Sequence, residues 1–215
     1  MINKNDFVMI NFVGRIASTG QIFDLTDKEI AEKENIKGEY NFAPVLVVAG
    51  GNYVLKAISD SLIGKNVGEK YKIKVQPKDA FGEFNKNLIK TYGLSIFRSN
   101  NINPSVGDVI MLDDKMATVL AINSGRVLVS YNHPLAGKEL LYDIDILSLV
   151  ENSKDKCSGI FEHYTGKKPE EVEINENSVL ITTKEELKPY ITDSISMDIQ
   201  NYISKDLKVE IKKVS

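Results

Sequence analysis

The chain has 215 residues, with 27 basic and 30 acidic side chains and a formal net charge of −3. This near balance argues against a general nucleic-acid-binding protein, which usually carries a basic excess. A chain of this length buries roughly 70% of its unfolded surface, so its core needs no disulfide or metal. Because there is one cysteine and there are only two histidines, we expect no internal disulfide, no Cys/His zinc site and no cofactor.

No targeting or membrane segment is expected. Lys4 and Asp6 interrupt the N-terminus, which therefore lacks the apolar core of a signal peptide. A membrane-spanning helix needs about 20 mostly apolar residues, and the sequence contains no such stretch. The single cysteine fits a reducing compartment. These features predict a cytoplasmic protein without membrane contacts.

Residues 1–85 are predicted to contain short strands and helices. Thr26 and Glu29 have the spacing of a capping box, which predicts a charged helix over residues 27–35. Runs of β-branched and aromatic residues predict strands over 7–13, 21–24, 45–49 and 71–75, the first two joined as a hairpin. Helical spacing predicts a second helix, closed by Gly64, with a buried face of Val54, Leu55, Ile58, Leu62 and Ile63.

Residues 86–130 have a different, turn-rich character and are predicted to form a small all-β module. Strands are expected over 106–112, 117–122 and 127–129. Asn123, Ser124 and Gly125 predict the hairpin turn between the last two of these strands. A module of this size is too small to be very stable as a wholly independent fold.

The remaining residues divide into two further segments. Residues 131–151 carry a long strand pattern over 140–150. A polar, charged stretch after residue 152 leads into a C-terminal α/β region. This region is predicted to contain a hairpin over 172–183, a helix capped by Asp193 and a final strand over 207–211.

Nucleophilic and phosphate-binding chemistry finds no support in the sequence. Cys157 lies among charged residues on a predicted linker, so we interpret it as a surface thiol and not as a nucleophile. We expect His133 to make a loop-capping hydrogen bond, and His163 to be a partly buried surface histidine. Gly50 and Gly51 lack the following Lys-Ser or Lys-Thr of a phosphate-binding loop.

Aromatic and aliphatic residues recur near the predicted turns, and each one alone is typical of core packing. Their order along the chain is more specific. It runs through Phe12-Val13-Gly14, Ile22-Phe23-Asp24, Tyr53-Val54-Leu55-Lys56-Ala57-Ile58, Asn66-Val67-Gly68-Glu69, Asp79-Ala80-Phe81-Gly82 and Leu141-Tyr142-Asp143-Ile144. This succession resembles the FKBP family of peptidyl-prolyl cis/trans isomerases. Residues 132–140, NHPLAGKEL, resemble the motif that follows the inserted domain of SlyD-type FKBPs, and the C-terminal region is similar to that of long archaeal FKBPs.

The resemblance implies an α+β fold, in which an FKBP-like antiparallel sheet wraps on a short helix. Residues 1–85 and 131–151 would form the FKBP-like domain, residues 86–130 a small all-β insert-in-flap domain, and residues 152–215 a C-terminal α/β domain. The implied function is isomerisation of X–Pro bonds in unfolded or partly folded polypeptides, with chaperone activity through the insert and the C-terminal region. The alternative is an FKBP-like chaperone or binding module with little or no isomerase activity.

The resemblance also implies which residues form the site. The backbone N–H of Leu55 would hold the substrate carbonyl, and Asp24 would be the polar member, although a turn-capping role for Asp24 stays open. The proline pocket would consist of Phe12, Phe23, Asp24, Val54, Leu55, Ile58, Phe81 and Tyr142. An insert this small cannot bury all its apolar residues, so a second substrate surface is expected at Leu94, Ile96, Phe97, Met111 and Met116.

The sequence departs from the family pattern in three ways. Ile58 occupies the position where FKBPs often carry tryptophan, and Phe81 replaces a tyrosine whose hydroxyl would bind the substrate carbonyl. The His-rich, nickel-binding tail of many SlyD proteins is missing, so no metal is expected. Because a separate core of about 60 residues is marginal, we also expect a homodimer through residues 152–215. The alternative is that this region docks onto the FKBP-like domain, which would bury the same surface.

Overall fold

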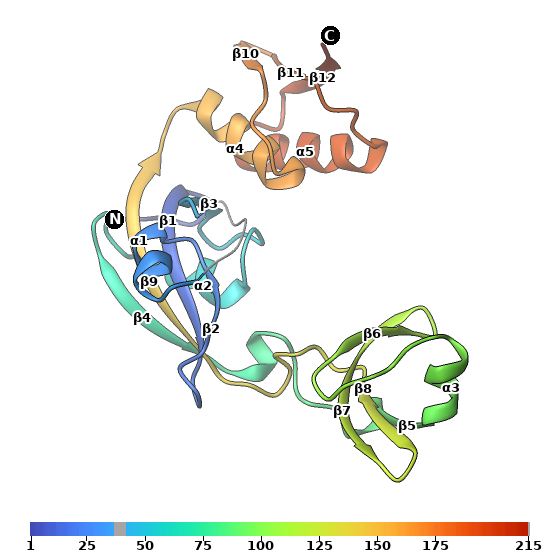
Figure 1. The fold of residues 1–215 in the computed structure, drawn as a ribbon. Helices are drawn as coiled ribbons and strands as arrows, with labels where there is room; N and C mark the ends of the chain where they lie inside the picture. The colour runs from blue at the N-terminus through green and yellow to red at the C-terminus, as the bar shows by residue number, and fades with distance from the viewer. Residues whose placement is uncertain (37–41, 215) are drawn as a thin grey trace. The chain divides into compact units, whose positions relative to one another are not determined.

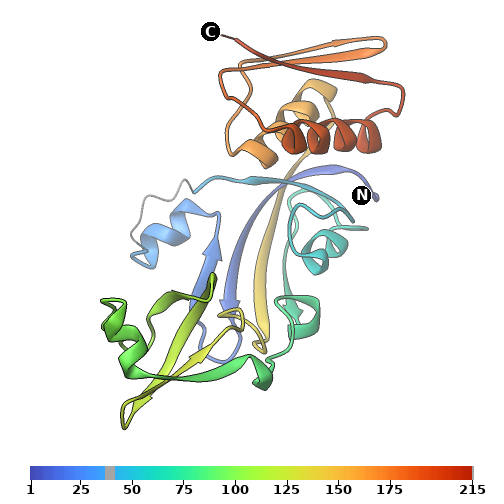
Figure 2. The same ribbon diagram turned by 90° about the vertical axis from the view of Figure 1, so that its right-hand side faces the viewer.

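The computed structural model (Figures 1 and 2) describes residues 1–36 and 42–214. Over these residues it contains five α-helices and twelve strands in three sheets, which confirms the predicted α+β class. None of the helices in this part of the chain is long and apolar enough to cross a membrane. The chain forms two compact units. One comprises Met1–Gly14, Ile22–Ile73 and Tyr142–Ser215, and the other comprises Arg15–Gln21 and Lys74–Leu141.

The largest sheet is formed by five strands in the order β2-β1-β9-β4, with β3 paired antiparallel to β1. Its strands are β1 (Phe7–Ile16), β2 (Ile22–Leu25), β3 (Val45–Val48), β4 (Lys70–Val75) and β9 (Leu140–Val150). Alternation in β9 buries Tyr142 and Ile144 on one face and directs Asp143 and Asp145 to the other. There the two carboxylates form ion pairs with lysines of β4, which explains the regular charge pattern of both strands.

Two short helices accompany this sheet, α1 (Lys28–Lys33) and α2 (Lys56–Ser61). The predicted capping box is wrong, because Asp27 and not Thr26 accepts the hydrogen bonds from the first N–H groups of α1. Thr26 is buried instead, and its Oγ1 accepts the N–H of Phe12 at 2.9 Å, tying the end of β2 to β1. The predicted buried face of α2 extends too far, since Ile63 is 43% exposed.

The second unit contains a four-stranded antiparallel sheet in the order β5-β8-β7-β6. Its elements are the 3-10 turns η1 (Pro77–Asp79) and η2 (Lys86–Leu88), β5 (Ile89–Gly93), α3 (Leu94–Ser99), β6 (Val109–Leu112), β7 (Lys115–Asn123) and β8 (Arg126–Ser130). Helix α3 is absent from the strand-only prediction for this segment, and its Phe97 is fully buried at the centre of the small core. The turn predicted at Ser124 and Gly125 is confirmed, with positive φ at both residues.

The C-terminal segment packs two helices on one face of a three-stranded sheet (Figures 1 and 2). Its elements are α4 (Ser153–Thr165), β10 (Glu171–Asn175), β11 (Ser178–Thr183), α5 (Pro189–Tyr202) and β12 (Lys208–Lys213). The hairpin and final strand are confirmed, and β12 lies parallel to β11. The predicted start of α5 at Asp193 is wrong, because the helix begins at Pro189 and Asp193 lies within it.

The linker predicted around Cys157 is a helix, so the interpretation of this residue as a surface thiol is wrong. Asn152 caps α4, and Cys157 is fully buried in a core formed with α5 and β11. Phe7 of β1 and Val48 of β3 belong to the same core and are also fully buried. The C-terminal segment therefore shares a hydrophobic core with the edge of the main sheet.

Candidate active site

Three strands of the main sheet bring together Phe12, Phe23 and Tyr142, three of the four aromatic residues predicted for the proline pocket. The ring centroids of Phe12 and Tyr142 are 5.9 Å apart, and those of Phe23 and Tyr142 are 5.7 Å apart. Both pairs meet edge to face, the arrangement that the ring quadrupoles favour. Phe12 and Tyr142 are buried while Phe23 is half-buried. We call these three side chains the aromatic cluster.

Gly14 makes the aromatic cluster sterically possible. A Cβ atom at this position would lie 2.8 Å from Phe23 Cζ and 2.9 Å from Tyr142 Cε1, closer than side chains tolerate. The absence of a side chain therefore lets both rings lie over β1. Gly14 was not among the predicted pocket residues, although its position two residues after Phe12 places it on the same face of the strand.

Asp24 follows Phe23 directly and retains solvent contact. Partial desolvation raises the pKa of its carboxyl group, and a hydrogen bond from the backbone N–H of Leu25 acts in the opposite direction. Desolvation raises the pKa of the Tyr142 hydroxyl, and the charge of Asp24 raises it further. This effect links the carboxylate electrostatically to Tyr142, while the Leu25 contact is what a turn-capping role would require.

The loop before α2 carries Val54 and Leu55, both half-buried, and the helix itself carries the buried Ile58. The carbonyl of Leu55 accepts hydrogen bonds from the first turn of α2. Within the described part of the chain, the N–H of Leu55 donates no hydrogen bond to another protein group. Such unpaired donors are characteristic of helix beginnings, and this one is available to a substrate carbonyl.

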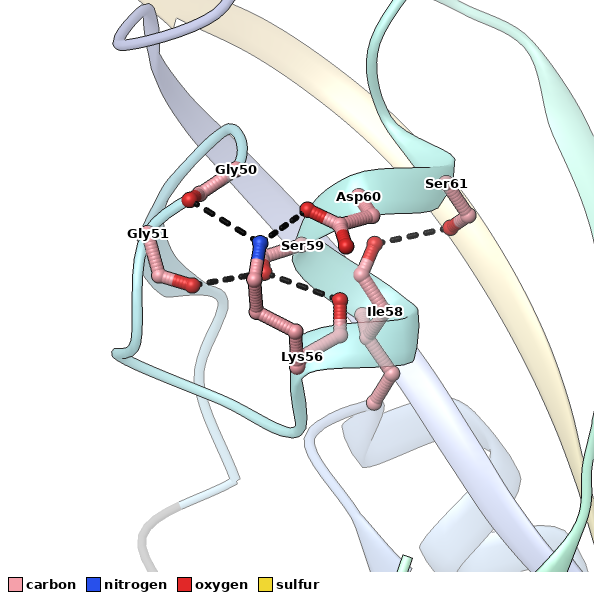
Figure 3. Close-up of polar contacts among 7 residues, drawn as sticks. All are labelled: Gly50, Gly51, Lys56, Ile58, Ser59, Asp60 and Ser61. Atoms are coloured by element: carbon pink, nitrogen blue, oxygen red, sulfur yellow. Dashed lines mark hydrogen bonds and ion pairs between the residues drawn. The ribbon is translucent and has the colours of Figure 1, made fainter. Parts of the chain in front are cut away.

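Side chains of α2 form hydrogen bonds to Gly50 and Gly51, at the beginning of this loop (Figure 3). Ser59 is fully buried, and its Oγ donates to the carbonyl of Gly51 at 2.7 Å. The ammonium group of Lys56 donates to the carbonyl of Gly50 at 3.2 Å and also pairs with Asp60. Sequence reasoning did not identify Ser59, which looks like an ordinary helix residue until its partner eight positions earlier is known.

In the second unit, residues 132–137 of the NHPLAGKEL segment hold the beginning of the insert in place. The ring of His133 stacks on Phe81 with centroids 4.3 Å apart, and its Nδ1 accepts the N–H of Leu135 at 3.1 Å. The second contact confirms the loop-capping role predicted for this histidine. Asn132 accepts the N–H of Asn85 at 2.9 Å and donates to the carbonyl of Asn85 at 3.0 Å, joining the two chain segments that enter and leave the insert.

The residues predicted for substrate contact in the insert divide into two groups. Phe97 is fully buried and Leu94 packs against the same core, so neither belongs to an open surface. In contrast, Ile96, Met111 and Met116 are exposed by 45%, 59% and 57%. Met111 and Met116 face each other across the β6–β7 pair. The prediction missed Val109, two residues before Met111, and Leu120, four residues after Met116, which are exposed as well.

Other candidate sites are less distinctive. Among the described residues, no group of three or more His, Cys, Asp or Glu side chains is placed to hold a metal ion. A cavity of about 220 Å³ is lined by residues of α1, β1, β4 and β9. Phe12 lines this cavity and also belongs to the aromatic cluster, but none of the other predicted pocket residues is in the lining.

Comparison with known proteins gives relatives of one kind. The family described as "FKBP26, IF domain" matches residues 93–135. The chain is 24% identical over 147 residues to a short-type peptidyl-prolyl cis-trans isomerase of Methanocaldococcus jannaschii, covering 68% of this chain and 92% of that protein. It is 26% identical over 127 residues to the FKBP-type isomerase SlyD of Pasteurella multocida, covering 57% and 63%.

A third relative extends the comparison over a similar part of the chain. This is the FKBP-type 16 kDa peptidyl-prolyl cis-trans isomerase of Escherichia coli, 24% identical over 153 residues, which are 69% of this chain and 93% of that protein. All three relatives are named as peptidyl-prolyl cis-trans isomerases. Over about two thirds of its length the chain is therefore similar to FKBP-type peptidyl-prolyl cis/trans isomerases, SlyD among them, and residues 93–135 match the IF domain of such a protein.

Proposed function

We propose that the protein accelerates cis/trans isomerisation of X–Pro bonds in unfolded or partly folded polypeptides and that its insert holds these chains during folding. The observation that carries the isomerase part is the aromatic cluster of Phe12, Phe23 and Tyr142. The N–H of Leu55, which has no partner among the described residues, adds a donor for the substrate carbonyl. The relatives named as peptidyl-prolyl isomerases support the same activity.

The physical basis of catalysis is differential solvation of the amide. Rotation about the peptide bond breaks its resonance and has a barrier of about 18–20 kcal/mol, so uncatalysed X–Pro bonds isomerise in tens to hundreds of seconds. The planar amide is more dipolar than the twisted transition state, and an apolar pocket therefore favours twisting. A thousandfold acceleration requires about 4 kcal/mol of such differential stabilisation. No nucleophile or proton transfer is involved.

The pocket residues have distinct roles in this proposal. The aromatic cluster and Ile58 surround the proline ring, and the N–H of Leu55 holds the carbonyl so that rotation occurs at the prolyl bond. Asp24, which follows Phe23 of the cluster in β2, orients the dipole of the twisting amide through its negative charge. Fixing one end of the substrate in this way lowers the entropy lost on reaching the transition state.

Isomerase activity is tested by magnetisation exchange on a short peptide with one X–Pro bond. We expect faster exchange with the protein than without it, and a lower rate for Phe23→Ala in a protein that still unfolds cooperatively. Exchange equal to the uncatalysed rate would refute the isomerase proposal. That result would favour the binding module, the alternative suggested by the loss of the tyrosine hydroxyl at Phe81 and by the absence of tryptophan.

The chaperone part rests on the outward face of the β6–β7 hairpin, formed by Val109, Met111, Met116 and Leu120. Exposed apolar patches of this kind mark binding surfaces, and methionine adapts to partners of irregular shape. Strand β6 is also at the edge of its sheet, where an extended chain has backbone groups to pair with. A second binding surface raises the concentration of substrate at the proline pocket.

The two parts are separable by experiment. Replacing Met111 and Met116 together by threonine keeps β-propensity and removes most of the apolar surface. We expect unchanged turnover of short X–Pro peptides, slower catalysed refolding of a whole protein limited by proline isomerisation, and weaker suppression of aggregation. The matched control is Thr118→Val on the same hairpin, which adds apolar surface. Equal losses on peptide and protein substrates in the methionine variant would contradict a separate holding surface.

A further inference from the structure

We propose that Asp198, in the C-terminal helix α5, is a positioning residue for the proline site. Its carboxylate holds the hydroxyl of Tyr53 and thereby fixes the part of the loop that presents Val54 and Leu55. The inference rests on the proposed isomerase function, and it gives the C-terminal segment a role in catalysis without placing it in contact with substrate.

The central contact joins residues that are far apart in the sequence. The hydroxyl of Tyr53 donates to Asp198 Oδ2 at 2.9 Å, and the hydroxyl of Tyr164 on α4 donates to the same oxygen at 2.8 Å. Hydrogen bonds to a charged acceptor are roughly twice as strong as those between neutral groups. Tyr53 immediately precedes Val54 and Leu55, so its hydroxyl anchors that part of the loop.

The ring of Tyr53 is also held by the C-terminal helices. It stacks on His163 with centroids 3.9 Å apart and planes 5° from parallel, and it meets Tyr202 edge to face at 6.2 Å. Desolvation raises the pKa of the Tyr53 hydroxyl far above its usual value, and Asp198 raises it further, so the hydroxyl keeps the proton that it donates. Desolvation lowers the pKa of His163, which favours a neutral stacking partner.

The loop therefore has two independent points of attachment. Its beginning is bound by α2 through Ser59 and Lys56 (Figure 3), while Tyr53 is bound by α4 and α5. Gly51 lies close to the second attachment, because a Cβ atom there would be 3.3 Å from the hydroxyl oxygen of Tyr202. Losing the bond from Tyr53 to Asp198 would release the second half of the loop, which carries the N–H of Leu55, and would leave the first half in place.

The test compares two variants of the full chain that remove one hydroxyl each. Tyr53→Phe keeps the stacked ring and removes its bond to Asp198. Tyr164→Phe removes an equivalent bond to the same oxygen from a residue outside the pocket loop, and it keeps the ring that meets Tyr53 edge to face at 6.5 Å. The two should lose similar thermal stability. We expect about a tenfold lower kcat/KM on a short X–Pro peptide for Tyr53→Phe, because small displacements of a positioning group are costly, and less than a twofold change for Tyr164→Phe.

A second readout follows the loop directly. The amide resonance of Leu55 should shift and broaden in Tyr53→Phe and in Asp198→Ala, and should be unchanged in Tyr164→Phe. Because both groups act through one bond, the double variant Tyr53→Phe/Asp198→Ala should lose no more activity than Asp198→Ala alone.

Equal kcat/KM values for the two tyrosine variants would overturn the proposal, and so would a Leu55 resonance that is the same in Tyr53→Phe and in the unmodified protein. If the unmodified protein shows no isomerase activity, the proposed function fails by itself. In that case the Leu55 resonance still decides whether Asp198 holds the loop.

Discussion

Gly14→Ala is expected to impair the proline site by displacing its two rings. The added Cβ would lie 2.8 Å from Phe23 and 2.9 Å from Tyr142, whereas ordinary contacts begin at 3.4 Å, so the rings must move by at least 0.6 and 0.5 Å. Overpacking of this kind costs about 1–3 kcal/mol. Replacing glycine by alanine in a strand offsets roughly 0.5–1 kcal/mol of this. We expect a net loss of about 0–2.5 kcal/mol in the free energy of unfolding.

The effect on activity should exceed the effect on stability. Since a displacement of about 1 Å in a binding site can reduce a rate by about 10²-fold, a shift near half that size predicts about a tenfold loss in kcat/KM. The assay is isomerisation of a short X–Pro peptide, with denaturant unfolding measured on the same samples. The matched control is Gly93→Ala, where the new Cβ would meet Ser95 Oγ at an ordinary 3.4 Å. Wild-type activity in Gly14→Ala would show that the aromatic cluster is not the site.

Three further predictions concern a titrating group, a thiol and the oligomeric state. Burial raises the pKa of the Asp24 carboxyl group above its ordinary 3.8. The folded protein therefore binds the carboxyl proton more tightly than the unfolded chain does. As a result, the free energy of unfolding falls as the pH rises from about 3.8 through the raised pKa. Asp24→Asn should remove this fall in thermal unfolding scans from pH 3 to 7, and an unchanged pH profile would contradict it. Burial also raises the pKa of the Cys157 thiol to about 12. A thiol reagent at pH 8 should therefore modify Cys157 only after the protein is unfolded in guanidinium. Fast reaction of the folded protein would be inconsistent with the buried position. Homodimerisation through residues 152–215 stays a prediction, and light scattering of the full chain tests it. A monomeric mass would contradict the prediction.

Local patterns in the sequence determined most of the strands and turns. The alternation of apolar and polar residues over 140–150 predicted β9 with its bounds, because a strand places successive side chains on opposite faces whatever it packs against. The turn at Ser124 and Gly125 followed from the conformations that these residues adopt. The loop cap at His133 likewise depends on a partner only two residues away.

Tertiary structure decided the features that depend on partners distant in the sequence. The charged surface of α4 concealed the buried position of Cys157, because a helix with one narrow apolar face reads locally as a polar stretch. Thr26 has the spacing of a helix cap, yet its hydroxyl is bound by the N–H of Phe12 on another strand.

The order of the family segments indicated the pocket, but not what holds it. Gly14 gives the rings of the aromatic cluster their space, and Asp198 binds Tyr53 across 145 residues of chain. Neither contact has a signature in the sequence around it. The physical reason is that periodicity and turn chemistry depend on near neighbours along the chain, whereas ring packing and buried hydrogen bonds depend on which surfaces the completed fold brings together.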